Sequence, residues 1–456
     1  MAGGFWTPDN RIVLGIIQGG LEEVSADGGV PWPLTSLSQQ EQSHLFPWLL
    51  PDGRHFIYTR SGGPAAGIYV GALDKKPQEQ SLQRLLPDQT NAMYVPANEA
   101  GADSGKGYLL FTREVTLMAQ PFDADRLKVS GQAISVAEEV RSVGIASASS
   151  GLAASSNGFL AYLTGTVEFN LMWFDRKGKN LGTIGPPGAH NMMALSHDGT
   201  QLVSSRDGDI WLLDVVRNVT RRLTNKRGIV GFPVWSPTGD RVAFSYGQNG
   251  AFDLYQKRTN GAGEEELIYK SGEPKNLNDW SRDGRYLLYS VIDPKTKSDL
   301  WELPLEGERK PVRVAGTEFF EGQGQFSPDS QWIAYVSDET GRAEIYVRPS
   351  LASAGATGGG IVSQGGGYQP RWRPDGKELF YFSGDRTLMA AEVTTGKVGV
   401  PKALFQAPLG GAGATTNVHR WDVAPDGQRF LIPVVAKSIT KTPITVVVNW
   451  TASLKK

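Results

Sequence analysis

Short apolar runs separated by turn residues recur along the whole chain, and no long stretch has the 3.6-residue periodicity of an amphipathic helix. Most runs follow the tetrapeptide Ser-Pro-Asp-Gly or a close relative, at intervals of roughly 40 to 50 residues. The clearest copies are WSPTGDRVAFS from Trp235, WSRDGRYLLYS from Trp280, FSPDSQWIAYVS from Phe326 and WRPDGKELFYFS from Trp372. The proline, or the residue that replaces it, lies at Pro8, Pro51, His197, Pro237, Arg282, Pro328, Pro374 and Pro425. A fixed period of this size indicates a repeat architecture.

Each repeat predicts four short strands. An apolar strand runs into the Pro-Asp-Gly turn, where Pro presets its backbone angle and Gly accepts a positive one. A second strand follows, as at 241–245, and a third comes after a polar loop, as at 209–214 and 344–349. A less apolar fourth strand, such as 220–224, closes the repeat. Four antiparallel strands in such a period are typical of a propeller blade, so the expected fold class is all-β.

The number of rings is a separate question. Two weaker copies, GKGYLLF from Gly105 and SSNGFLAYL from Ser155, bring the total to about ten modules. These can form one wide ring or two rings. The last module has three apparent strands, with ITVVVNW as the third, and the segment 171–185 can supply its closing strand. The division we favour therefore places four modules in residues 1–169 and a six-bladed ring in residues 170–456.

Composition excludes several classes of function. The net charge of -1 gives no electrostatic reason to expect binding to nucleic acid or to an anionic membrane. The chain has no cysteine, which excludes disulfides, thiol catalysis and thiolate metal sites. The first residues contain no signal peptide and no apolar run long enough to span a bilayer, so the chain as written predicts a cytoplasmic protein without membrane insertion.

The modules resemble TolB-like propeller repeats, and they are most similar to the C-terminal propeller regions of bacterial, notably acidobacterial, serine/threonine protein kinases. The phrases that carry this resemblance include FPWLLPDGRHFIY, LMWFDRKGKNLGTIGPPG, GQFSPDSQWIAYVSDETGRAEIYV and QPRWRPDGKELFYFS, and it extends over essentially all 456 residues. It implies a sensing or binding propeller located outside the inner membrane.

Kinase activity is not implied, because the chain has no Gly-rich loop with a following Lys, no His-Arg-Asp and no Asp-Phe-Gly. No hydrolase domain follows the repeats, so the serine peptidase branch of the resemblance does not apply either. The chain is expected to be a propeller-only member of this group or a piece of a longer member.

Three histidines and one glutamate occupy equivalent positions at the start of the innermost strand of their modules: His44, His190, His419 and Glu321. Equivalent positions on different blades point to the same rim of a central channel. Imidazoles and a carboxylate can hold a divalent ion such as zinc or calcium, which can activate water.

Asp279 and Asp422 lie near the same rim and can act as further ligands or as a catalytic base. The alternative is that these polar residues line a water-filled channel and bind no metal. His55 and His197 lie in or just after a turn and are expected to be solvated.

Two functions follow from these observations. The first is a non-catalytic propeller that binds or senses a protein or a small-molecule ligand at its rim or channel, which the resemblance and the lack of catalytic motifs favour. The second is a metal-dependent hydrolase of an ester, lactone or phosphoester, with its site at the channel mouth.

Overall fold

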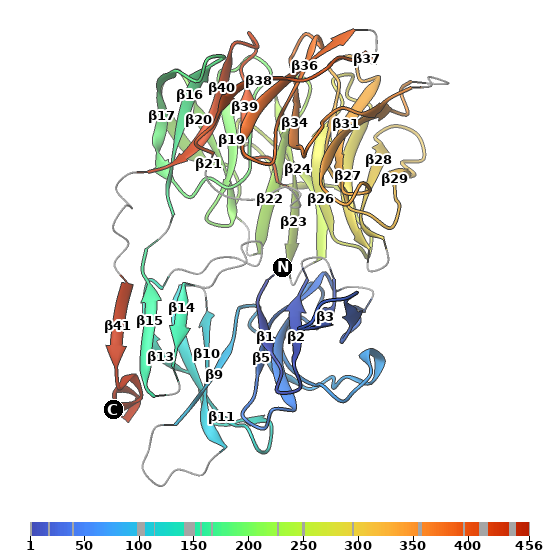
Figure 1. Ribbon diagram of the computed structural model, residues 1–456. Coiled ribbons are helices and arrows are strands. Elements are labelled where there is room, and N and C mark those ends of the chain that lie inside the picture. Colours follow the sequence, from blue (N-terminus) through green and yellow to red (C-terminus); the bar gives the residue numbers. More distant parts are fainter. Residues whose placement is uncertain are drawn as a thin grey trace. The chain divides into compact units, whose positions relative to one another are not determined.

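The protein is built almost entirely from β-strands (Figure 1). The structure, a computed structural model, describes residues 2–16, 19–38, 41–97, 105–113, 115–140, 151–155, 157–165, 167–225, 228–248, 251–293, 296–353, 358–394, 397–409, 418–436 and 444–455. These residues include the short 3-10 helices η1 (Pro77–Glu79) and η3 (Trp450–Lys455) but no α-helix, which confirms the all-β prediction. None of their helices is long and apolar enough to cross a bilayer. The chain forms two compact units, Met1–Thr166 with Thr440–Lys456 and Val167–Ile439.

The first unit contains four antiparallel sheets in its described residues. The first sheet consists of β1 (Gly4–Trp6), β2 (Arg11–Gly15), β3 (Leu21–Ser25) and β4 (Trp32–Pro33). The second consists of β5 (Ser43–Leu49), β6 (His55–Ser61), β7 (Gly67–Ala72) and β8 (Arg84–Leu86). The third consists of β9 (Met93–Pro96), β10 (Lys106–Arg113), β11 (Thr116–Asp123), β12 (Lys128–Val129) and β13 (Ile134–Ala137). The fourth consists of β14 (Leu152–Ala154), β15 (Phe159–Leu163) and β41 (Ile444–Val448).

The C-terminal strand β41 does not belong to the sheet that the sequence pattern suggested. It pairs antiparallel with β15, from Phe159 opposite Val448 to Leu163 opposite Ile444, and the red β41 lies beside β15 in Figure 1. Trp450 then packs into the core of the first unit. Residues 440–456 therefore belong to the first unit and not to the ring, where the sequence-based division had placed them.

The second unit contains six antiparallel sheets in its described residues. One joins β17 (Asn180–Gly188), β16 (Phe169–Asp175), β40 (Arg429–Val435) and β39 (Asp422–Val423). The next two are β18 (Met193–Leu195), β19 (Gln201–Arg206), β20 (Asp209–Asp214) and β21 (Val219–Arg222), and then β22 (Ile229–Trp235), β23 (Arg241–Gln248), β24 (Ala251–Arg258) and β25 (Glu266–Tyr269). They are followed by β26 (Lys275–Trp280), β27 (Tyr286–Asp293), β28 (Lys297–Pro304) and β29 (Val312–Ala315), and by β30 (Glu321–Phe326), β31 (Trp332–Ser337), β32 (Glu344–Pro349) and β33 (Gly360–Ile361). The last is β34 (Tyr368–Trp372), β35 (Glu378–Phe382), β36 (Thr387–Thr394), β37 (Lys397–Val398) and β38 (Lys402–Gln406).

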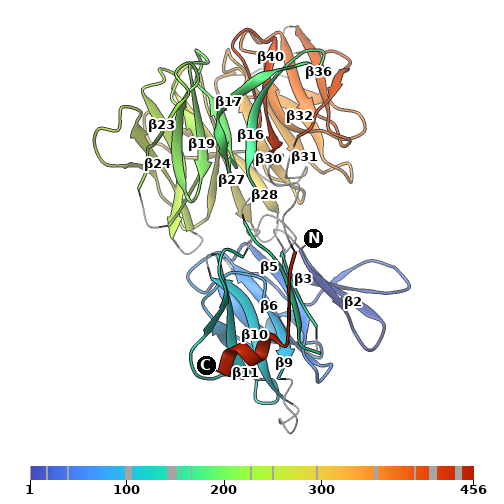
Figure 2. The same ribbon diagram turned by 90° about the vertical axis from the view of Figure 1, so that its left-hand side faces the viewer.

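These six sheets close into a ring. Their innermost strands contact one another in the order β18, β22, β26, β30, β34, β39 and back to β18. The closing sheet combines β16 and β17 from the start of the unit with β39 and β40 from its end, and Figure 2 shows the green β16 beside the red β40. The segment 171–185 is thus the outer part of the final blade, joined to it by the pairing of β16 with β40.

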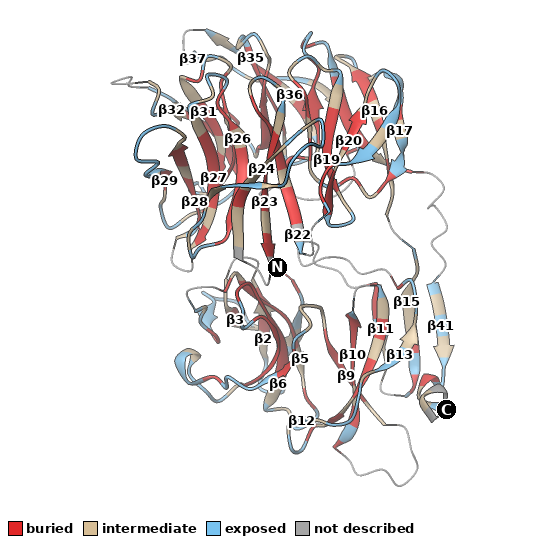
Figure 3. Cartoon of the chain, turned by 180° about the vertical axis from the view of Figure 1, so that it is seen from behind, coloured by how far each residue is buried: buried red, intermediate tan, exposed pale blue. Residues whose placement is uncertain are grey.

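The middle strands of the blades are buried on both faces, because each sheet of a ring packs between two others (Figure 3). In β35 all five residues are buried, and in β19 the four central ones are. A strand buried on both faces favours apolar residues at consecutive positions, which explains why the sequence shows mainly apolar runs after each turn.

Candidate functional site

The innermost strands of the six-bladed unit surround a cavity of about 100 Å³ at the end where they run into the Pro-Asp-Gly turns. This volume has room for several water molecules. Each of the six innermost strands contributes one residue to a layer that lines it: Ala194, Val234, Asp279, Gln325, Arg371 and Asp422. Four of these six side chains are polar, so the cavity wall is polar where the blades meet.

Three side chains of this layer each link their own blade to the next one, at three of the six junctions between blades. Each accepts a hydrogen bond from a backbone N–H of the following innermost strand. The donors and acceptors are Phe326 N and Asp279 Oδ2 (2.8 Å), Trp372 N and Gln325 Oε1 (2.7 Å), and Leu195 N and Asp422 Oδ2 (2.7 Å). The aspartates that the sequence suggested as catalytic groups therefore hold the ring together, since backbone N–H groups inside a protein need acceptors.

A second set of hydrogen bonds between neighbouring blades is made by the side chains of Gln323 and Gln369. The strands β30 and β34 each carry a β-bulge, where Gln323 and Gln369 have positive φ angles of 53° and 54°. Gln323 Oε1 accepts from Gln369 N at 2.5 Å, and Gln369 Oε1 accepts from Arg420 N at 2.8 Å. A bulge redirects the side chain at that point of the strand, here toward the neighbouring blade. These bonds give the channel a preformed wall.

Arg371 neutralises Asp422. The guanidinium is buried and its Nε lies 3.5 Å from Asp422 Oδ1. It also donates hydrogen bonds to two backbone carbonyl oxygens, those of Trp421 at 3.1 Å and Met193 at 3.2 Å. Val423 N donates to Asp422 Oδ1 at 2.8 Å. The charges of Arg371 and Asp422 thus neutralise each other and are hydrogen-bonded, as buried charges must be.

Asp279 lies on the opposite side of the ring from Asp422 and has no such cation against it. Its carboxylate accepts from the N–H of Phe326 and of Trp280, at 2.8 and 2.9 Å. Burial nevertheless raises the pKa of Asp279 to about 6, because a desolvated carboxylate is costly and these bonds offset only part of that cost. Asp279 is therefore an acid that titrates close to neutrality.

Arg282 stands at the mouth of the cavity, in place of the turn proline. It keeps accessible surface toward the opening, while the protein around it lowers its pKa through burial. Within the described part of the chain it makes no hydrogen bond and no ion pair, and the carboxylates of Asp279 and Asp422 act on it electrostatically, which raises its pKa against the effect of burial. It is a free guanidinium directed at a polar cavity.

Two histidines also line the cavity. His197 is partly buried, and burial lowers its pKa to about 4, so the prediction that it is solvated was wrong. Its Nε2 has no hydrogen-bond partner among the described residues. His419 is 8% exposed, and neither of its ring nitrogens has a hydrogen-bond partner in the part of the chain that the structure describes. Burial and the nearby Arg371 lower the pKa of His419 well below its usual value, so both rings are neutral at pH 7.

The other suggested metal ligands of this unit bind within their own blades. His190 contacts Ser204 Oγ through Nδ1 at 3.2 Å. The carboxylate of Glu321 accepts hydrogen bonds from the backbone N–H of Thr317 at 3.3 Å and from the hydroxyl of the same residue. Neither residue is part of the cavity wall.

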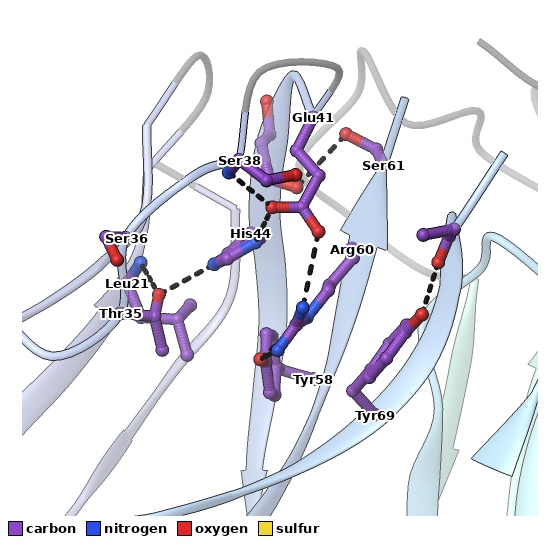
Figure 4. A network of polar contacts seen from close by, with 12 residues as sticks. Leu21, Thr35, Ser36, Ser38, Glu41, His44, Tyr58, Arg60, Ser61 and Tyr69 are labelled. Carbon is purple, nitrogen blue, oxygen red and sulfur yellow. Dashed lines mark hydrogen bonds and ion pairs between the residues drawn. The ribbon is translucent and has the colours of Figure 1, made fainter. Parts of the chain in front are cut away.

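His44 lies in the first unit, inside a buried polar network (Figure 4). Its Nδ1 is 2.7 Å from the hydroxyl of Thr35, and its Nε2 is 3.3 Å from Glu41 Oε2. Arg60 donates to Glu41 Oε1 at 3.4 Å and to the Tyr58 hydroxyl at 2.8 Å. The sequence of hydroxyl, imidazole and carboxylate is that of a catalytic triad.

This network is structural. Thr35, His44 and Glu41 are all nearly inaccessible, and the Thr35 hydroxyl already accepts a hydrogen bond from Leu21 N at 2.7 Å. A substrate has no access to such a hydroxyl. The bonds from Ser38 N and His44, together with Arg60, lower the pKa of Glu41 to about 2 despite its burial. The network thus consists of satisfied groups that fix the first two sheets against each other.

The suggested metal ligands do not form a common group. His44 belongs to a different unit from His190, His419 and Glu321. In the described part of the chain no three histidine or carboxylate side chains lie close enough together to hold a metal ion. Three of the suggested residues, His419, Asp279 and Asp422, do line the same cavity. Its other charged or titratable side chains, those of Arg282, Arg371 and His197, were not proposed as site residues from the sequence. A signal existed, because Arg282 and His197 replace proline in the repeated turn, at a position that borders the channel.

Comparisons with known proteins agree with the fold. No protein-family model and no curated protein matches the chain. Among solved structures, a TolB-like protein from Agrobacterium tumefaciens is 20% identical over 60% of this chain and 99% of its own, with a TM-score of 0.50. TolB from Acinetobacter baumannii (13% identity, 75% of this chain and 79% of its own, TM-score 0.40) and an oligogalacturonate lyase from Vibrio parahaemolyticus (10%, 89% and 99%, 0.40) are also similar. At these identities the first match shows the fold alone: the structural neighbours of this chain are TolB-like β-propeller proteins.

Proposed function

We propose that the chain is a ligand-binding β-propeller whose site is the cavity at the turn end of the six-bladed channel. One observation carries the proposal: the closed ring encloses a cavity whose wall includes buried ring nitrogens of His419 and His197 that have no hydrogen-bond partner among the described residues, beside the guanidinium of Arg282. Buried polar atoms without partners are costly, and a bound ligand or water can satisfy them. A preformed cavity with a few convergent polar groups is the usual form of a small-molecule site.

The resemblance to kinase-associated propellers favours the same function, because it implies a propeller that senses or binds a ligand. That resemblance remains a prediction from the sequence. The metal-dependent hydrolase has no support from a specific contact in the described residues.

A panel of small molecules with carboxylates, phosphates, amines and neutral sugars tests the proposal by saturation-transfer NMR with the full chain. The variant Ala194→Phe places a phenyl ring in the cavity, and Ala262→Phe places the same ring on an exposed loop. We expect at least one member of the panel to bind the wild type and Ala262→Phe but not Ala194→Phe. If no molecule of the panel binds in this way, the proposal is contradicted.

A further inference from the structure

We infer that the ligand group seated in the channel cavity is an oxyanion, a carboxylate or a phosphate, bound by Arg282 at the mouth. This inference rests on the proposed function and adds the chemical class of the ligand. It follows from three features of the wall: the type of hydrogen-bonding position left open, the charge balance, and the one acid in the wall whose ionisation state can change near neutral pH.

Among the described residues, the polar atoms of the cavity wall that lack a hydrogen-bond partner are mainly donors. The acceptors already have partners, because Asp422 binds Arg371 and two backbone N–H groups, and Asp279 binds two more. By contrast, the guanidinium of Arg282 has no partner among the described residues, and a neutral His419 must present one N–H without an acceptor. A ligand that fits these positions supplies acceptor oxygens, and guanidinium binds carboxylate and phosphate through two parallel hydrogen bonds.

The charges around Asp279 decide how strongly such an anion is held. The charged or titratable groups that face Asp279 are Arg282 on its own blade, Arg371 on β34, Asp422 on β39, and the two cavity histidines. Arg371 is committed to Asp422, so an incoming anion meets the cation of Arg282 and the carboxylate of Asp279. While Asp279 is ionised, the two charges nearly cancel.

Protonation of Asp279 removes that balance. Burial places its pKa at about 6, whereas that of His197 is at about 4, so between pH 5 and 7.5 Asp279 is the group of this wall that changes charge. An anion beside the site favours the protonated carboxyl, so binding takes up a proton and becomes tighter as the pH falls through 6. The cavity therefore acts as an anion site that strengthens in mildly acidic solution.

Sulfate is a suitable probe, because it is an oxyanion whose own charge is constant over this range. Titrations of the full chain with sodium sulfate, against sodium chloride at equal ionic strength, are followed through the ring signals of the five histidines by NMR. We expect saturable shifts of His197 and His419 but not of His55, with a Kd about ten-fold lower at pH 5 than at pH 7.5.

Variants separate the contributions. Arg282→Gln abolishes the saturable shifts at both pH values, and Arg285→Gln, an exposed arginine paired with Asp283, leaves them unchanged. Asp279→Asn keeps the shape of the side chain without its charge. We expect this variant to bind sulfate, at pH 5 and at pH 7.5, with the affinity that the wild type has at pH 5. It tests the inference even if Arg282→Gln fails to fold.

Sulfate binding that is absent, that moves all exposed histidines alike, or that has the same Kd at both pH values in the wild type overturns the inference. The panel of small molecules makes this failure distinguishable from failure of the proposed function. If amines or sugars bind in a manner that Ala194→Phe abolishes while sulfate does not bind, the site is real and its ligand is not an oxyanion. If neither binds, both proposals are wrong.

Discussion

Glu302 shows at the scale of a single residue what burial does to an acid in this fold. It lies on β28 without accessible surface, and its carboxyl oxygens accept from Leu351 N at 3.1 and 3.2 Å. Burial raises the pKa of Glu302 to about 7. A carboxyl whose folded pKa exceeds its unfolded value stabilises the fold below the unfolded pKa, near 4.5, and this contribution is lost as the pH rises through 7.

We therefore expect Glu302→Gln to leave the free energy of unfolding nearly unchanged at pH 5 and to raise it, relative to wild type, by roughly 2 to 4 kcal/mol at pH 8. The amide keeps an oxygen for Leu351 N but cannot ionise. Urea denaturation at the two pH values measures the difference. Glu306→Gln, at an exposed position near the end of the same strand, is the control, and an equal effect of both variants would refute this interpretation of Glu302.

At the scale of an element, the repeated turn owes its geometry to its serine. Ser327 donates from Oγ to Asp329 Oδ1 and accepts from Trp332 N at 2.9 Å, so one side chain closes the turn from inside. The copies at Ser196, Ser236 and Ser281 each accept the equivalent N–H. The pattern read from the sequence is therefore a hydrogen-bonding unit, in addition to a set of favourable backbone angles.

Replacing Ser327 by Ala leaves the backbone N–H of Trp332 without this acceptor and removes one of the hydrogen bonds to the Asp329 carboxylate, which still accepts from Gln331 N. We expect the six-bladed unit to lose about 1 to 2 kcal/mol of stability in chemical denaturation, with its fold unchanged by circular dichroism. The control Thr340→Ala removes an exposed hydroxyl from the loop that follows β31 and should cost much less. Equal losses would show that the turn serine has no special part in stability.

At the scale of the whole molecule, the chain leaves the first unit, completes a closed ring and returns to the first unit for its last strand. Trp450, 1% exposed, packs there edge-on against Tyr108 with ring centroids 5.7 Å apart. Trp421, fully buried in the ring, donates from Nε1 to Gln369 O at 3.1 Å. The two tryptophans thus belong to the hydrophobic cores of different units.

Two unfolding transitions are expected in calorimetry of the full chain. Trp450→Ala should destabilise only the first unit and Trp421→Ala only the second, each by about 3 to 5 kcal/mol. If either variant moves both transitions equally, the two units unfold together, and the separation into two cooperative units is wrong.

Much of the fold is contained in the local pattern of the sequence. The repeated turn and its spacing determined the fold class, and β20 and β32 have the bounds that the apolar runs at 209–214 and 344–349 indicated. The reason is that strand and turn formation depend on residues close together in the chain, which alternate or cluster visibly. The same pattern also located Asp279 and Asp422 near the channel.

Tertiary structure alone decided which distant segments meet. Strand β41 has an apolar pattern that fits any sheet edge, and only packing assigns it to β15. Equivalent repeat positions did not make His44, His190 and Glu321 neighbours, because the repeats divide into two units and each side chain has partners close to it in the chain: Thr35 and Glu41 for His44, Ser204 for His190 and Thr317 for Glu321. By contrast, the six blades close into a ring, and this places Arg282 at the same cavity as His197 and Asp279. Such distances depend on ring closure between residues far apart in sequence, about which a local pattern carries no information.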